Sequence, residues 1–206
     1  MEDIKDHLKD ISEMRALMER NSKFLSLSGL SGVSAGICAL IGAFVAWRFL
    51  GTVSEFSRHS VSHTQSDLYF FFFLDAGLVM IGALVTATFF SLRMAKKKKL
   101  PIWTPSSKQL LLNLLLPLTS GAAFCLILLW HGWIALIPAS MLIFYGLALL
   151  NASKYTLPEI KWLAICEVVL GLGCAIWVHA SLLFWAFGFG ILHIVYGIVM
   201  YVKYER

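Results

Sequence analysis

Long apolar stretches separated by short polar segments dominate the pattern of this chain. Six stretches approach or exceed the roughly 20 mostly apolar residues with which an α-helix crosses the hydrocarbon core of a bilayer. Two of the connections, near residues 132 and 179, are very short, and a short connection makes neighbouring helices antiparallel. The pattern therefore predicts an all-α polytopic membrane protein whose six transmembrane helices form three helical hairpins. The predicted spans are residues 24–50, 68–92, 110–130, 133–150, 162–178 and 180–202.

The residues outside these stretches are too few for a second folded unit. The loops at 51–67 and 93–109 are short, and none of the remaining segments is large enough to bury a core of its own. We therefore expect two regions, an arm over residues 1–23 and a helical bundle over residues 24–206.

The arm has the pattern of an amphipathic helix. Its apolar residues recur at steps of three and four, and the other face mixes acidic and basic side chains. Three interpretations remain open: the helix lies on the bundle or the lipid surface, it self-associates, or residues 2–20 bind a cytoplasmic protein partner. The candidate partner-binding face is Ile4, Leu8, Ile11, Met14 and Met18.

Composition and charge support the membrane assignment and give its direction. Of the 206 residues, 59% are hydrophobic and 14% are charged, where soluble domains carry about 25% charge. This composition excludes a disordered chain, a secreted disulfide scaffold and an ordinary cytosolic enzyme. All of the 17 lysines and arginines except Arg48 and Arg58 fall in the arm, the tail and alternate connections. Because cytoplasmic loops are rich in these residues, we expect a multi-pass protein with both termini in the cytoplasm.

The first part of the chain resembles a known family. The residues that carry the resemblance are Glu2-Asp3-Ile4-Lys5, Met18-Glu19-Arg20 and Leu27-Ser28-Gly29-Leu30-Ser31-Gly32-Val33, within residues 2–43. They are similar to an EDIK…MERSS arm that leads into an LSGLSGV-type first helix in small, uncharacterised six-span membrane proteins of Bacteroidetes-like bacteria. Members of that family are often encoded beside a winged-helix transcription regulator. The resemblance implies a bacterial inner-membrane location and a regulatory or sensing role, and it supplies no catalytic residues.

Ionisable residues inside a span are costly to bury and therefore mark candidate functional sites. Glu167 precedes the turn near residue 179 by about as many residues as His193 follows it, so both should lie near the bilayer middle. The same count from the turn near residue 132 places Thr119 and Tyr145 at this depth. Three interpretations of this midplane polar site remain open: a hydrogen-bonded layer that fixes helix register, a proton or substrate pathway, and a metal or haem site. Asp75 is a separate buried acid towards the outer side.

Other candidate sites carry weaker signals. Lys96, Lys97, Lys98 and Lys99 fit either a topology signal or a site for anionic lipid headgroups. His59 and His63 have the i,i+4 spacing of metal ligands on a helix, but they lie in a Ser-rich loop, so a metal role is weakly indicated. The four cysteines lie within spans without C-x-x-C spacing, which is typical of small buried side chains.

No enzyme motif, nucleotide-binding fingerprint or nucleic-acid-binding feature is visible, and the residues identify no cofactor. The first hypothesis is a non-enzymatic integral membrane protein that regulates or binds a partner. The alternative is a small-solute or proton-coupled transporter or channel that uses the midplane layer, and the third is a cofactor- or metal-binding membrane protein. Gly32 and Gly36 form a G-x-x-x-G pair, which fits either tight packing within the chain or a homo-oligomer.

Overall fold

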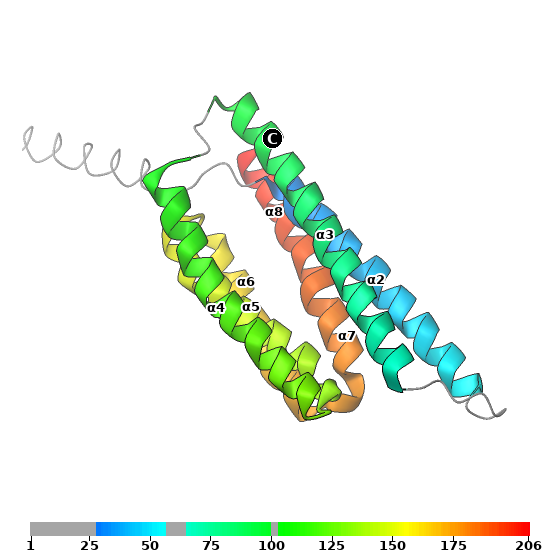
Figure 1. Cartoon of the computed structure of the whole chain (residues 1–206). Coiled ribbons are helices and arrows are strands. Elements are labelled where there is room, and N and C mark those ends of the chain that lie inside the picture. Colours follow the sequence, from blue (N-terminus) through cyan, green and yellow to red (C-terminus); the bar gives the residue numbers. More distant parts are fainter. Residues whose placement is uncertain (1–27, 57–64, 100–102) are drawn as a thin grey trace, which may run out of the picture.

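The computed structural model describes residues 28–56, 65–99 and 103–206. Every regular element in these ranges is a helix (Figure 1). The longest are α2 (Gly29–Phe56), α3 (Gln65–Lys97), α4 (Pro105–Trp130), α5 (Ile137–Ala152) and α6 (Glu159–Ile176). The last rod consists of α7 (Ser181–Trp185), the π-helix η5 (Ala186–Leu192) and α8 (His193–Tyr204). Single 3₁₀ turns lie at the connections: η2 (Ile134–Leu136), η3 (Ser153–Tyr155) and η4 (Val178–Ala180).

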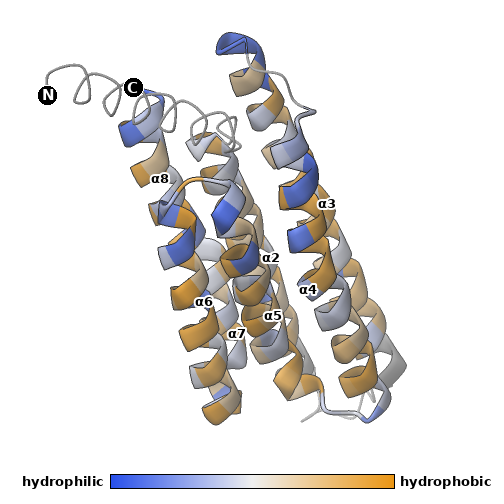
Figure 2. Cartoon of the chain, turned by 90° about the vertical axis from the view of Figure 1, so that its left-hand side faces the viewer, coloured by the Kyte–Doolittle hydropathy of each residue, from blue (hydrophilic) through white to orange (hydrophobic). Residues whose placement is uncertain are grey.

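Five segments in the described ranges are long and apolar enough to cross a membrane. They are Gly29–Gly51, Leu68–Lys97, Pro105–Trp130, Ile134–Tyr155 and Val178–Tyr204. The remaining long helix, α6, has 18 residues, among them Glu159, Lys161 and Glu167. Large apolar side chains such as Phe70, Phe73 and Leu78 point outward, and Figure 2 shows apolar colours along the middle of the rods with polar colours near their ends. Such a surface suits contact with the hydrocarbon core of a bilayer. The predicted all-α class is confirmed for the described residues.

Local chemistry explains two of the helix boundaries. Thr104 and Ser107 form a capping box at the start of α4, because each side chain accepts a hydrogen bond from the other residue's backbone amide. Pro105 occupies the first turn, where its missing amide hydrogen costs nothing. After α4 the chain reverses at Gly132, whose φ of +76° lies in the left-handed region that favours glycine.

The rods form two groups of three, which Figure 1 shows as separate bundles. The central group contains α4, α5 and α6, with α5 packed against both of its neighbours. The terminal group contains α2, α3 and α8, with α2 packed against the other two. Contacts between the groups come mainly from α7 and η5, whereas α6 and α8 touch little. Although α6 and the last rod are consecutive in the chain, each therefore packs mainly within its own group.

The small residues of α2 are used inside the chain. A methyl group on Gly32 would lie 3.2 Å from the His193 carbonyl oxygen, and one on Gly36 would lie 2.6 Å from the Gly190 carbonyl oxygen. The G-x-x-x-G pair therefore lets the backbone of α2 approach that of η5 and α8 closely.

Polar contacts join the helix ends at one side of the bundle, which we call the charged end. The Glu205 carboxylate accepts hydrogen bonds from the Gly29 amide and the Ser28 hydroxyl, and therefore places a negative charge at the start of α2. Lys98 donates to the Tyr204 carbonyl oxygen over 3.1 Å, which ties the end of α3 to the end of α8.

Candidate functional site

The centre of the candidate site is Glu167, in the middle of α6. The buried residues of this helix recur at steps of three and four, and Glu167 lies on that stripe between Ala164 and Gly171. Helix periodicity thus turns the carboxyl group inward. Its side chain has 0% exposure, and neither oxygen has a hydrogen-bond partner among the described residues.

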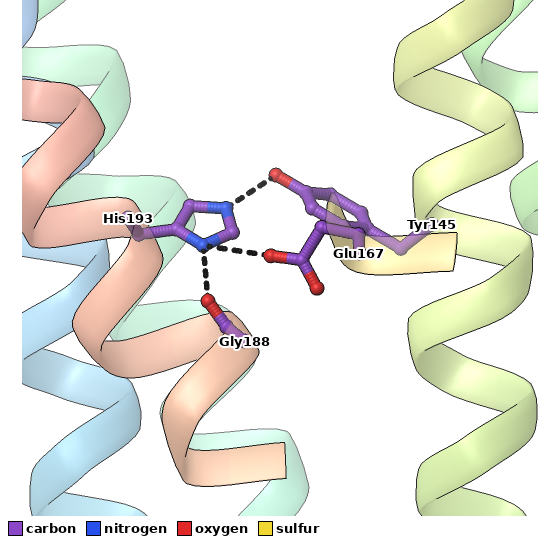
Figure 3. A network of polar contacts seen from close by, with 4 residues as sticks. All are labelled: Tyr145, Glu167, Gly188 and His193. Atoms are coloured by element: carbon purple, nitrogen blue, oxygen red, sulfur yellow. Dashed lines mark hydrogen bonds and ion pairs between the residues drawn. The ribbon is translucent and has the colours of Figure 1, made fainter. Parts of the chain in front are cut away.

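His193 reaches Glu167 from the other helix group. It is the first residue of α8, directly after the π-helix η5, and it is 7% exposed. Its Nδ1 lies 3.0 Å from the Gly188 carbonyl oxygen and 3.4 Å from Glu167 Oε1 (Figure 3). π-Helical turns often occur at functional sites, and here the wider turn places a backbone carbonyl beside the imidazole.

Gly188 leaves room for the carboxyl group. A methyl group at this position would lie 2.7 Å from Glu167 Oε2 and 2.5 Å from Leu142 Cδ2. Any larger residue would push against Glu167, so the contact with His193 depends on this glycine.

Tyr145 on α5 completes the cluster. Its hydroxyl oxygen lies 2.7 Å from His193 Nε2, and the two rings are in tilted contact (Figure 3). A carbonyl oxygen can only accept, so the contact with Gly188 requires a hydrogen on Nδ1. In neutral His193, Nε2 then accepts from the Tyr145 hydroxyl, and in the imidazolium it donates to the Tyr145 oxygen. The same geometry thus serves both charge states of the ring.

The Glu167–His193 pair has two arrangements without net charge. One proton can be held on the carboxyl group beside a neutral imidazole, or on the imidazole beside a carboxylate. Loss of this proton leaves a net negative charge in the bundle, and a second proton leaves a net positive one. Either charge would be buried without compensation, which is costly. The chemistry that the cluster offers is therefore the holding and transfer of one proton.

The cluster also joins the two helix groups. Tyr145 and Glu167 belong to α5 and α6 of the central group, whereas His193 begins α8 of the terminal group. Elsewhere along these helices α6 and α8 make few contacts, so this polar contact links parts that otherwise meet mainly through α7 and η5.

The structure brings three of the four predicted midplane residues together and leaves out the fourth. Thr119 is exposed on α4, and its hydroxyl donates to the Leu115 carbonyl oxygen of its own helix over 2.9 Å. Its predicted place in the polar layer is wrong because the residue count gives depth but not the direction in which a side chain points. Asp75 is partly buried on α3, where an oxygen of its carboxyl group would lie 3.6 Å from a methyl group placed on Gly42 of α2.

The other predicted sites lie elsewhere or outside the described residues. Lys96, Lys97, Lys98 and Lys99 are exposed at the charged end. The proposed partner-binding face of the arm, as well as His59 and His63, lies outside the described ranges. All four cysteines are free, and the part of the chain that can be described holds no group of three or more His, Cys, Asp or Glu suited to a metal ion.

One polar group was missed by the sequence patterns. Glu159, at the start of α6, accepts hydrogen bonds from the Lys203 ammonium and from the Tyr204 hydroxyl, the latter over 2.9 Å. Partial burial acts to raise the pKa of Glu159, but the hydrogen bonds from Lys203, its own backbone and Tyr204, together with the Lys203 charge, hold it below its ordinary value. The Lys203-Tyr204 dipeptide at the end of the last span was visible in the sequence, but its partner was not.

Comparison of the chain with protein-family models, curated proteins and solved structures gives no match. The resemblance of residues 2–43 to a bacterial membrane family therefore remains a prediction.

Proposed function

We propose that the chain is a six-span protein of the bacterial inner membrane, in which α6 crosses the bilayer as the fifth span along the chain and the charged end lies in the cytoplasm. α6 is about 27 Å long at 1.5 Å per residue, close to the thickness of the hydrocarbon core. Its Lys161 and Glu159 lie in its first turn, where they reach the headgroup region. This arrangement gives three successive antiparallel pairs and puts the lysines of α3 and α8 on the cytoplasmic side, in agreement with the charge distribution.

The function that the site supports best is a non-enzymatic, proton-responsive regulatory role. The observation that carries this proposal is the position of Glu167: a fully buried carboxyl group without hydrogen bonds, 3.4 Å from an imidazole of the opposite helix group. A change in the number of protons on the pair creates an uncompensated buried charge. If the two helix groups moved apart, this charge would come into contact with water. Protonation and the relative position of the groups are therefore linked.

The arm is the part of the chain suited to pass this change to a cytoplasmic partner. Only residues 24–27 separate it from Ser28, whose hydroxyl donates to Glu205 at the end of the last rod. Deletion of residues 2–20 should abolish capture of the partner while the bundle still folds, and unchanged capture would reject this part of the proposal.

Proton-coupled transport of a small solute is the second candidate. It is favoured by the two three-helix groups, because movement of one helix bundle against another around a midplane site is the usual basis of alternating access. Transport requires that a proton gradient drive the accumulation of a solute in proteoliposomes. The regulatory role requires only that the relative position of the two helix groups change with pH.

The test of the proposal follows protonation and shape together. Cysteines introduced for spin labels at Leu172 on α6 and Val199 on α8, both exposed, would report the distance between the groups in lipid after the native cysteines are replaced. We expect this distance to change with pH in step with the infrared band of the Glu167 carboxyl group. The change should be absent in Glu167→Gln and retained in the control Asp75→Asn. A distance that is the same at all pH values at which the protein is folded would refute the proposal.

A further inference from the structure

Between the buried pair and the charged end, α6 and α8 carry two buried polar oxygens that have no hydrogen-bond partner within the described part of the chain. One is the Tyr196 hydroxyl, and the other is Glu159 Oε2, both inaccessible to solvent. The other Glu159 oxygen takes both Lys203 and Tyr204, so Oε2 remains free to accept. Because buried polar groups are nearly always hydrogen-bonded, these two oxygens call for an explanation.

Their positions place them on one route. Tyr196 follows His193 by three residues, one helical turn, and precedes Lys203 by seven, two turns. The Tyr145 and Tyr196 rings pack against the same apolar cluster, which contains Leu163 and Ala164 of α6. Along α8, Tyr196 lies between His193 and Tyr204, whose hydroxyl donates to Glu159. The tyrosine thus stands between the buried pair and the carboxylate at the charged end.

We propose that the Tyr196 hydroxyl relays protons and, together with Glu159, connects the Glu167–His193 pair to the charged end. This inference rests on the proposed function. A water bound to Tyr196 and Glu159 Oε2 would satisfy both oxygens, and a phenol hydroxyl can donate and accept at the same time.

The transfer balances without any other reactant. The exposed Lys203 ammonium gives a proton to the Glu159 carboxylate and takes another from the solvent. The proton on Glu159 then passes through the water to the Tyr196 oxygen, while the phenol's own proton moves to the Tyr145 oxygen and the Tyr145 proton moves to His193 Nε2. Tyr196 stays neutral, Glu159 returns to the carboxylate, and the buried pair has gained one proton.

The surroundings suit this route better than the alternatives. Leu149, Ile160 and Leu163 form a buried apolar cluster, against which Tyr145 and Tyr196 both pack. At the opposite end, the Phe184 ring of α7 is stacked on the Trp177 ring. A proton that enters from the charged end meets a hydroxyl on its way, whereas one that enters from the opposite end meets aromatic packing.

The experiment measures both the extent and the rate of Glu167 protonation. The full chain in proteoliposomes would be subjected to a pH jump, and the carboxyl infrared band assigned by its loss in Glu167→Gln would be followed with time. We expect Tyr196→Phe to leave the final extent unchanged and to slow protonation by about 100-fold, the lower end of what a placed proton-transfer group contributes. Glu159→Gln should slow protonation from the charged end only.

The matched control is Tyr201→Phe, since Tyr201 lies on α8 but is 41% exposed and away from this route. Its rate should equal that of the unmodified protein, and the melting temperatures of both variants should show that they fold. Equal rates for Tyr196→Phe and the unmodified protein, or equal slowing by both tyrosine variants, would overturn the inference. A Glu167 band that does not respond to pH at all would instead refute the proposed function itself.

Discussion

Direct coupling between Glu167 and His193 can be measured as a free energy. The perturbation is a double-mutant cycle with Glu167→Gln, His193→Gln and the double variant. Glutamine keeps the approximate length of both side chains but holds no titratable proton. The loss of the contacts with Tyr145 and Gly188 accompanies His193→Gln whether or not Glu167 is present, so it cancels in the cycle. The remaining free energy is the interaction between Glu167 and His193.

The distance sets the expected magnitude. Two unit charges separated by the observed 3.4 Å attract by about 5 kcal/mol at an effective dielectric constant of about 20. A neutral pair at this distance would contribute about 1 kcal/mol or less, because 3.4 Å is long for a hydrogen bond. These two values bracket the contribution of a pair that shares one proton, and we expect a coupling free energy of about 2–5 kcal/mol.

The assay is reversible unfolding in mixed micelles, followed by helical circular dichroism across a range of pH. The coupling should be largest where the pair holds one proton and should fall on either side, as a second proton is gained or the first is lost. A coupling below about 0.5 kcal/mol at every pH, within the usual error of additivity, would refute the reasoning. Glu167 and His193 would then be independent neighbours.

Three further predictions follow from particular contacts. Gly188→Ala should lower the free energy of unfolding by about 1–3 kcal/mol, because the added methyl group overpacks the site. Gly77→Ala, whose methyl group would have nothing within 4 Å, should leave the free energy of unfolding unchanged or raise it by up to about 1 kcal/mol. Thermal melts of the two variants compare them directly. The lowered pKa of Glu159 means that its carboxylate stabilises the fold above the unfolded-state value of about 4.3 and that this contribution is lost as the pH falls through the folded-state pKa. Glu159→Gln should therefore cost about 0.2–1 kcal/mol at neutral pH, because Lys203 is largely exposed, and an equal cost in strong acid would contradict the assignment. Thr119→Val should change stability by less than about 0.5 kcal/mol, and a larger loss would mean that this hydroxyl has a partner beyond its own helix.

Hydropathy located the helices well but not their ends. The second predicted span stops at residue 92, whereas α3 continues to Lys97, because backbone hydrogen bonds carry a helix past the point where its side chains cease to be apolar. The same limit applies to η5. Its residues Ala186–Leu192 are as apolar as those of an α-helix, so no periodicity distinguishes a π-helical turn before the three-dimensional packing is known.

The site was predictable as far as depth and no further. The fixed rise per residue and two tight turns put Glu167, His193 and Tyr145 at one height, and the structure brings these three side chains into contact. Direction was not predictable for Thr119, since the arrangement of six apolar helices around one another is not encoded in a hydropathy profile. The role of Gly188 could not be predicted from the sequence either, because its carbonyl oxygen binds His193 and its missing side chain leaves room for Glu167.

The location of the pair distinguishes a responsive site from a purely structural one. A hydrogen-bonded layer that only fixes helix register would be most effective between helices that already pack closely, such as α5 and α6. Glu167 instead points from α6 towards His193 of the other group, and it does so without a hydrogen bond to either of its oxygens. The number of protons on this carboxyl group and its histidine partner therefore changes the free energy of holding the two helix groups together by the cost of a buried charge. We therefore expect Glu167→Leu, which removes one partner of the coupled pair, to lower the free energy of unfolding and to abolish the pH-dependent change in the distance between the two helix groups.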